Sequence, residues 1–460
     1  MSVNTQAQEL GTKKHPPGLY LLFLTEMWER FSYYGMRAIL ILYLTTELVS
    51  GGLGIDNKTA LSIYGFYTGA VYFTPLIGGW LADRYLGHRL SITIGGVLMA
   101  LGNIALFSHQ SQTFLYIGLA LLIAGNGFFK PNISTLLGQL YKGNESRRDA
   151  GYTIFYMGIN VGAFFAPLLI GFVSEDLFAK TVDGVMTYGY KYGFLISAIG
   201  MIIGQVLFNL FANKLLGDAG KRPIVDRTKD SKNKSNNAPL TKSEKQRTWV
   251  IIIITCFVVF FWAGFEQAGS SLTLYTKDFV DRSVFGYTVP VSWFQSLNPL
   301  FIVLLAPLVS ALWVKLASSK RGDIPVPTKM AMGMITLGLG YIVLLFAIFK
   351  TGNDAATIQH KASIMFIVVT YFLHTMGELF LSPVGLSLVS RIAPVKLASL
   401  LMGVWLASSG IANIIAGQLA AITQSLGYFE VFALIGGVAI FFGLILLTLS
   451  KKLVAMMQIK

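Results

Sequence analysis

Long apolar stretches alternate with short polar ones along almost the whole chain. Each stretch has about 20 or more mostly apolar residues, which as an α-helix would cross the roughly 30 Å hydrocarbon core of a bilayer. The pattern predicts twelve membrane-spanning helices. We expect them over residues 18–48, 60–82, 90–108, 113–140, 150–174, 191–214, 248–276, 288–314, 327–349, 361–390, 396–423 and 428–450.

One polar segment divides this pattern into two halves. Residues 217–247 are rich in Lys, Asp, Asn and Ser and are too polar to bury, so we expect a solvated cytoplasmic linker. It separates an N-terminal six-helix bundle, residues 18–216, from a C-terminal six-helix bundle with a short tail, residues 248–460. Residues 1–17 form a polar N-terminal tail. The predicted fold class is an all-α polytopic membrane protein.

Composition supports this assignment. The chain has 460 residues, of which 54% are hydrophobic and 13% charged, and a water-soluble protein could not hide that apolar share in one core. Residues 1–17 lack the apolar core and cleavage site of a signal peptide, so the first helix itself is expected to direct insertion. The single cysteine, Cys256, excludes an internal disulfide framework, and we expect it to be a small buried apolar residue.

The distribution of Lys and Arg predicts the orientation. Most of the 36 basic residues fall on the side that holds both termini and the linker, which the positive-inside rule assigns to the cytoplasm. The net charge of +14 therefore reflects topology. The basic residues lie in separate loops with no aromatic platform, so we expect contact with membrane lipids and no nucleic-acid partner. The predicted location is the inner (plasma) membrane.

Charged residues inside the apolar spans are the strongest functional signal. Charge at that depth is costly and usually marks the path of a solute or a proton. On the first span, four of these residues share one helix face with Tyr33, and this face must meet protein or water. A structural alternative is a self-neutralised cluster that only holds helices together. The charged residues are Glu26, Glu29, Arg30, Arg37, Lys130, Glu266 and Glu378.

These charges are divided unequally between the halves. The N-terminal half carries three cations and two anions at mid-depth, whereas the C-terminal half carries two anions, so neutrality requires pairing between halves or protonation. We expect gating salt bridges Arg37–Glu266 and Lys130–Glu378. Breaking one leaves a buried charge that costs several kcal/mol unless a proton or a ligand replaces the partner. A zwitterion such as a short peptide or an amino acid would suit this site.

At these same residues the sequence resembles the bacterial type of the proton-dependent oligopeptide transporters, the POT or PTR family of the major facilitator superfamily. The resemblance covers nearly the whole chain, and its most specific motif is E-x-x-E-R at residues 26–30. It implies a major facilitator fold in which two six-helix bundles rock around a central cavity. Further matching segments are GGWLADRYLGHR (78–89), GNGFFKPNIS (125–134), FYMGINVGAFFAP (155–167), FWAGFEQAGSSL (261–272) and GELFLSPVGLS (377–387).

The resemblance also implies residue roles. Proton coupling would fall to Glu26, Glu29, Arg30 and Glu266. The peptide carboxylate would be held by Arg30, Arg37 and Lys130, with Glu266 also in the pocket and Glu378 receiving the peptide amino terminus. For each matched aromatic residue, ordinary packing stays an alternative. The other matched substrate-binding positions are Tyr33, Tyr34, Tyr72, Asn160, Trp262, Asn298, Ser382 and Trp405.

Two departures from the family pattern are visible. Many bacterial members carry two extra helices between the halves, and residues 217–247 are too short and polar to supply them. The histidine that some animal members use on the second span is absent, because His88 lies in the loop after it. Proton binding would then fall to carboxylates.

Two weaker signals remain. Asp83, Arg84 and Arg89 lie in the loop after the second span, where they could latch the cytoplasmic face or serve topology alone. His374 lies four residues before Glu378, a spacing that suits a metal site or a proton relay. A plain polar core residue is the alternative for His374.

The sequence therefore predicts a proton-coupled symporter that imports di- and tripeptides by alternating access. Protons are the coupling ion, no metal or other cofactor is expected, and no ATPase subunit is required because no nucleotide-binding motif is present. We expect a functional monomer. An enzyme would need a nucleophile with its base or a metal cluster. The sequence shows neither, so we do not expect an enzyme. The open alternatives are a passive uniporter or channel, or a major facilitator transporter for another anionic or zwitterionic solute or a drug.

Overall fold

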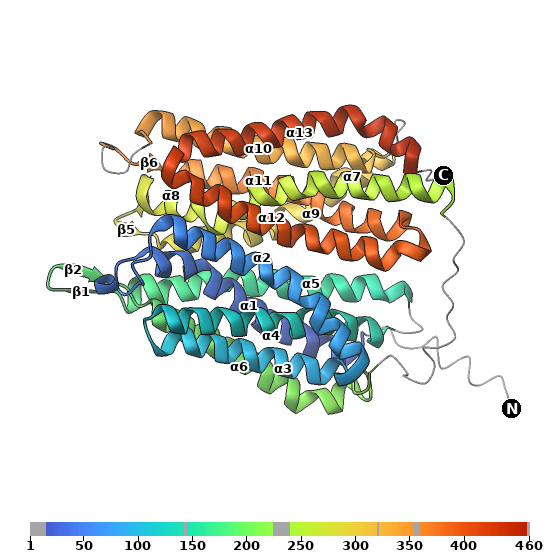
Figure 1. The fold of residues 1–460 in the computed structure, drawn as a ribbon, viewed down its shortest axis with the longest axis horizontal. Helices are drawn as coiled ribbons and strands as arrows, with labels where there is room; N and C mark the ends of the chain where they lie inside the picture. Colours follow the sequence, from blue (N-terminus) through green and yellow to red (C-terminus); the bar gives the residue numbers. More distant parts are fainter. Residues whose placement is uncertain (1–14, 142–144, 224–239, 320–321, 354–357, 458–460) are drawn as a thin grey trace.

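The computed structural model describes residues 15–141, 145–223, 240–319, 322–353 and 358–457. Long helices run roughly parallel along one axis of the molecule (Figure 1). The first group comprises α1 (Pro17–Thr45), α2 (Asn57–Leu81), α3 (His88–Ser108), α4 (Gln112–Leu140), α5 (Glu145–Gly171) and α6 (Tyr190–Leu216). The second group comprises α7 (Lys242–Phe265), α8 (Ser271–Phe279), α9 (Leu297–Ala317), α10 (Val326–Thr351), α11 (Ile364–Ile392), α12 (Ala398–Leu426) and α13 (Tyr428–Met457).

The helices confirm the predicted fold class. Within the described residues, ten helical segments are long and apolar enough to cross a membrane. Helices α1 and α2 lie alongside them although they fall short by composition (Figure 1). Helix α1 carries Glu26, Glu29, Arg30 and Arg37, and α2 is rich in tyrosine, glycine and threonine. Because these polar groups are buried against protein, both helices can lie in a membrane beside the other ten helical segments.

The seventh span differs from its prediction in two ways. It begins at Lys242, inside the segment expected to be linker, because a capping box starts the helix there. Thr241 accepts a hydrogen bond from the backbone N–H of Glu244 at 3.2 Å, and the Glu244 carboxylate accepts one from the backbone N–H of Thr241 at 2.8 Å. The span is also interrupted, since α7 ends at Phe265 and the 3₁₀ turn η4 (Glu266–Gly269) precedes α8.

The short β-strands gather at one end of the bundles (Figure 1). The hairpin of β1 (Lys180–Val182) and β2 (Val185–Thr187) and that of β4 (Ser283–Val284) and β5 (Tyr287–Thr288) are antiparallel. A parallel pair joins β3 (Val280–Asp281) to β6 (Ala362–Ser363). We call this the hairpin end, and the opposite end, where α1 begins and α13 ends, the terminal end (Figure 1). The remaining short elements are the 3₁₀ turns η1 (Leu48–Ser50), η5 (Val291–Ser296) and η6 (Val395–Leu397) and the π-helical segments η2 (Ala82–Leu86) and η3 (Phe172–Leu177).

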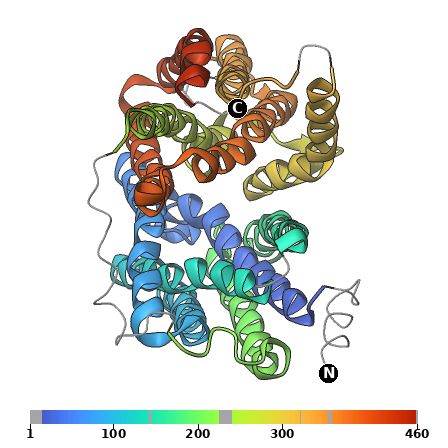
Figure 2. The same cartoon turned by 90° about the vertical axis from the view of Figure 1, so that its right-hand side faces the viewer.

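Each group of helices packs as a bundle of its own. Helix α1 packs on α5 and α6 in the first bundle, and α10 packs on α11 and α13 in the second. Figure 2 looks onto the terminal end and shows the second bundle above the first. They meet most extensively where α2 lies against α12. There a Cβ atom built on Gly65 would lie 2.4 Å from the Cα of Gly417, so the two backbones touch directly.

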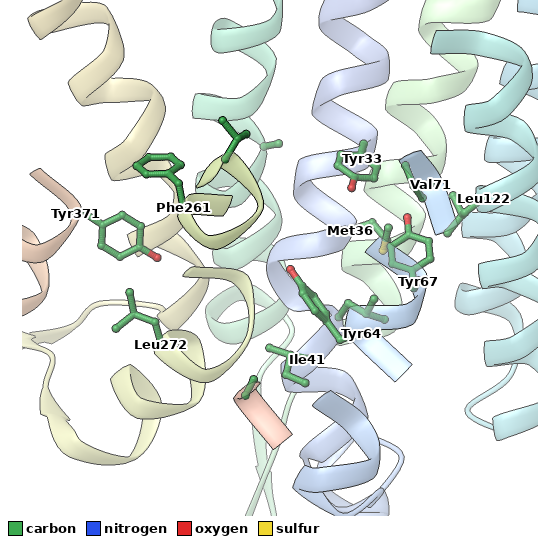
Figure 3. Packing of buried hydrophobic residues seen from close by; sticks show 14 of the residues in the cluster. Tyr33, Met36, Ile41, Tyr64, Tyr67, Val71, Leu122, Phe261, Leu272 and Tyr371 are labelled. Carbon is green, nitrogen blue, oxygen red and sulfur yellow. The ribbon is translucent and has the colours of Figure 1, made fainter. Parts of the chain in front are cut away.

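The bundle interiors are filled by large apolar and aromatic side chains. In the first bundle, Tyr33 and Met36 of α1 lie beside Tyr64 and Tyr67 of α2, all nearly inaccessible to solvent (Figure 3). Much of the apolar surface elsewhere is exposed, as expected for helices that face lipid. Cys256 belongs to that exposed surface of α7, which corrects the prediction that it is buried.

Candidate functional site

A cavity of about 420 Å³ lies between the two bundles. Its wall is built from α1, α2, α4 and α5 of the first bundle and from α7, α9, α11 and α12 of the second. Cations of the first bundle and carboxylates of both bundles therefore face one shared space. The predicted site residues in the wall are Glu26, Arg30, Tyr34, Arg37, Tyr72, Lys130, Asn160, Trp262, Glu266, Asn298, Glu378, Ser382 and Trp405.

The charges of α1 form a compact buried cluster around Arg30. Its Nε lies 2.9 Å from Glu26 Oε1 and 2.5 Å from Glu29 Oε2, and all three side chains are at most 5% exposed. Glu26 is one helical turn before Arg30, which brings the two groups together on one face. Within the described residues, Arg30 Nη2 is buried with no hydrogen-bond partner. An unpaired buried N–H is costly, so this donor is an unmet hydrogen-bonding demand inside the protein.

A cross-bundle ion pair joins Arg37 to Glu266. Arg37 Nη2 contacts Glu266 Oε2, and Arg37 Nε donates a hydrogen bond to the hydroxyl of Tyr64 at 2.7 Å. Glu266 is the first residue of η4, so the interruption after α7 turns its carboxylate toward α1. A Cβ on Gly269 would lie 2.0 Å from Tyr64 Oη, so only glycine lets η4 approach this closely. The predicted pair is present in this conformation.

The second predicted gating pair is not formed. The Lys130 ammonium lies 4.4 Å from the ring centre of Tyr72, a cation–π arrangement. Glu378 Oε2 instead accepts a hydrogen bond from Asn298 Nδ2 at 2.8 Å. Within the described chain, no ion pair within 4.0 Å links Lys130 to Glu378. The physical reason is that α4 and α11 stand on opposite walls, with the cavity between them.

Hydrogen bonds hold the bundles together toward the hairpin end. The carboxylate of Glu175 in η3 accepts hydrogen bonds from the backbone N–H groups of Val291 and Ser292 at 2.7 and 3.1 Å, and from the Ser292 hydroxyl at 2.7 Å. Trp293 Nε1 donates to the carbonyl of Leu168 at 2.9 Å. These contacts connect α5 and η3 to η5, so the cavity is closed on this side.

The accessibility of the cavity wall varies from residue to residue. Tyr156 of α5 and Leu406 of α12 both belong to its wall and are 50% and 51% exposed. The side chains of Arg37 and Glu266, nearer the hairpin end, are only 11% and 9% exposed. The structure therefore records a state in which the hairpin side is closed by ion pairing and hydrogen bonding, while part of the cavity wall stays accessible.

Two predicted residues lie outside the cavity wall. The Glu29 carboxylate is fully buried behind Arg30. Tyr33, predicted as a substrate contact, is 4% exposed, and its ring lies 5.6 Å below the Arg30 guanidinium. It turns toward α2 and packs near Tyr67 and Val71 (Figure 3). Tyr33 is absent from the described wall residues in this conformation, so its predicted contact with substrate stays a prediction.

Of the predicted cytoplasmic latch residues, Arg89 contacts the end of α6 in its own bundle. Arg89 donates hydrogen bonds to the carbonyls of Ala219 and Gly217 at 2.6 Å each, and to Asn213 Oδ1 at 3.2 Å. These groups lie at the end of α6, whose last carbonyls have no intrahelical donor. Arg89 thus ties α6 to its own bundle. Arg84 stacks over Trp80, and Asp83 lies 3.7 Å from His88 Nε2.

Several wall residues were not predicted from the sequence. Their side chains are uncharged and lie in apolar spans, where nothing distinguishes them from core packing. His374 also lines the cavity, with its ring 4.9 Å from that of Tyr341. In the part of the chain that the structure describes, no group of three His, Cys, Asp or Glu residues could hold a metal ion. The wall residues missed include Phe155, Tyr156, Phe265, Gln295, Tyr371 and Thr375.

The geometry is that of a known transporter family. The family model of the POT family (PTR2) matches residues 89–215 and 226–435 of this chain. Transporter YclF of Bacillus subtilis (strain 168) is 35% identical, with 98% of this chain and 96% of the relative covered. Peptide transporter YePEPT of Yersinia enterocolitica is 33% identical, with 88% and 87% covered.

Solved structures of the family share the whole fold. A mutant of the peptide transporter POT in complex with alafosfalin is 34% identical with a TM-score of 0.86, and 97% of each chain is covered. A POT family transporter in complex with 5-aminolevulinic acid is 32% identical, also with a TM-score of 0.86, and 96% and 98% of the two chains are covered. The chain therefore belongs to the POT family of membrane peptide transporters, the proton-dependent oligopeptide transporters of the major facilitator superfamily.

Proposed function

We propose that this protein is a proton-coupled symporter that imports di- and tripeptides by alternating access across the inner (plasma) membrane, with both termini in the cytoplasm. One observation carries the proposal. Opposite charges of the two bundles face a single cavity, with the pair Arg37–Glu266 formed and Lys130 and Glu378 apart. A peptide and a proton are the two species that could replace the missing partners of these charges.

The cavity offers complementary groups to both ends of a peptide. Arg30 and Lys130 line it from the first bundle and would bind the carboxylate. Glu378, with Asn298 beside it, faces it from the second bundle and would bind the amino terminus. Side chains of the peptide would lie against Tyr, Trp and Phe surfaces, which favours broad specificity.

Protons would act where a carboxylate holds a guanidinium. Protonating Glu266 removes the charge that holds Arg37, so the closed side could open. At Arg30, two carboxylates share one guanidinium, and a proton on Glu29 leaves Glu26 paired. Like charges this close disfavour double ionisation. With the proposed orientation the terminal end is cytoplasmic, and the closed hairpin end faces outward.

A single chain holds both bundles and the whole cavity, which supports a functional monomer that needs no ATPase subunit. The coupling ion we propose is the proton, with no further cofactor, and lipids are the surrounding partner.

The test is uptake of labelled dialanine into proteoliposomes. We expect accumulation above equilibrium under an inward proton gradient, abolished by a protonophore, and competition by unlabelled di- and tripeptides. Liposomes without protein provide the baseline. Equal rates with and without the gradient would instead indicate a passive uniporter.

A second candidate is transport of another anionic or zwitterionic solute or a drug. It is favoured by the relative solved with 5-aminolevulinic acid, which carries an amino group and a carboxylate but no peptide bond. Uptake of that compound without competition by dialanine would select this candidate over peptide import.

A further inference from the structure

A chain of hydrogen bonds connects Glu378 to the interior of α11. The Thr375 hydroxyl donates to the carbonyl of Tyr371 at 2.7 Å. Asn298 Nδ2 donates to Thr375 Oγ1 at 3.1 Å and to Glu378 Oε2 at 2.8 Å. Asn298 comes from α9, whereas the other three residues belong to α11, so this one amide links the two helices at the cavity wall.

The donors and acceptors around Asn298 fix which way its side-chain amide is turned. A hydroxyl has one proton, and Thr375 commits it to Tyr371, so its oxygen accepts from the next neighbour. An ionised Glu378 also only accepts. Both neighbours of Asn298 therefore require its NH₂ group, which has two protons to give. Turning the amide over would set its oxygen against the Glu378 carboxylate.

The carbonyl oxygen of Asn298 is left for the cavity. It has no hydrogen-bond partner among the described residues, and Asn298 is a partly exposed wall residue. Together with Glu378 it forms two acceptors next to each other, an arrangement that suits a group with several N–H donors. A primary ammonium is such a group, and a blocked amine is not.

We infer that Thr375 is a positioning residue for the amino end of the ligand, acting through Asn298. When a ligand ammonium engages Glu378, the carboxylate holds the amide less firmly, and Thr375 then keeps the Asn298 oxygen turned toward the cavity. Thr375 is fully buried and its bond to Asn298 does not depend on the charge of Glu378. This inference rests on the proposed function, because it assigns selectivity for a free amine to the peptide site.

A neighbouring threonine provides a matched control. Thr370 is also fully buried on α11, and its hydroxyl donates to the carbonyls of Phe366 and Gly340 at 2.8 and 3.2 Å. It does not line the cavity described above. Thr370→Val and Thr375→Val thus each remove one buried hydroxyl from α11, but only the Thr375 hydroxyl contacts Asn298.

The experiment measures inhibition of proton-driven dipeptide uptake by dialanine and by N-acetyl-dialanine. In Thr375→Val we expect the preference for the free amine to fall about tenfold, the loss of one hydrogen bond to a charged group. Inhibition by N-acetyl-dialanine should weaken much less than inhibition by dialanine. Thr375→Ser should restore the preference, and Thr370→Val should leave it at the wild-type value.

A double-mutant cycle separates positioning from general damage. If Thr375 acts through Asn298, adding Thr375→Val to Asn298→Ala should not lower the preference further. An independent further loss in the double variant would overturn the inference. So would an unchanged preference in Thr375→Val, or equal weakening of both inhibitors. Absence of dipeptide uptake by the wild type would refute the proposed function instead, so the two failures differ. If Thr375→Val does not fold, Thr375→Ala takes its place in the cycle.

Discussion

The ion pair between Arg37 and Glu266 is the feature whose removal should change the transport cycle most. In Glu266→Gln, Arg37 keeps its hydrogen bond to Tyr64 at 2.7 Å but loses the only carboxylate that it pairs with among the described residues. Because both side chains are nearly buried, the closed side should lose about 2 kcal/mol. That energy shifts the balance between closed and open hairpin ends by about thirtyfold.

The shift can be measured by cross-linking across the hairpin end. Tyr287 Oη donates to Asp176 Oδ2 at 2.5 Å between the two bundles and away from α2 and α12, so cysteines at these two positions report on closure. In a Cys256→Ser background, we expect cross-linking with a short bismaleimide to be markedly slower in Glu266→Gln. Proton-driven accumulation should be lost, while exchange of internal for external peptide continues, because the peptide-binding groups remain.

Glu430→Gln is the matched control. Glu430 accepts a hydrogen bond from Asn353 at 2.8 Å within the second bundle, also near the hairpin end, but does not cross to the first bundle. It should cross-link and accumulate peptide like the wild type. Normal accumulation and unaltered cross-linking in Glu266→Gln would refute the reasoning. Loss of both accumulation and exchange would indicate lost binding, which is also contrary to the expectation.

Three further predictions concern other parts of the molecule. Lys130→Ala should weaken uptake of peptides with a free carboxylate about tenfold but leave amidated peptides unaffected, and an unchanged preference in competition assays would contradict its role. Glu175→Ala removes the acceptor of three hydrogen bonds, so the same hairpin-end cross-link should slow at least tenfold, and a wild-type rate would argue against its closing function. Gly65→Ala should lower the melting temperature by several degrees, because its Cβ would lie 2.4 Å from Gly417. Gly403→Ala should leave the melting temperature unchanged, because its Cβ would meet nothing within 4 Å. Equal melting temperatures of the two variants would show that α2 and α12 separate freely.

The helices could be predicted well from hydropathy because each span must be apolar over its whole length. The interruption at η4 could not, since apolar residues on both sides of Glu266–Gly269 gave the pattern of one continuous span, and Gly269 resembles any other glycine of a membrane helix. The early start of α7 had a readable signal, the capping box of Thr241 and Glu244, but the charges around it favoured a solvated linker.

The charged site residues could be predicted because an ionised group is costly in an apolar span and rarely persists there without a function. Uncharged wall residues such as Tyr156 and Thr375 could not, since burial against helices and burial against a cavity select the same residue types. The separation of Lys130 and Glu378 depends on which conformation is populated, and composition does not encode that. For Arg89, the basic loop motif gave no sign that its donors serve the end of α6.

The direct backbone contact of Gly65 with Gly417 limits how the bundles can move. Two chains that touch without an intervening side chain have almost no room to slide or separate at that point. Any rocking of the bundles must therefore turn about the contact between α2 and α12. Displacement would then grow with the lever arm, and would be largest for the helices that stand farthest from α2 and α12.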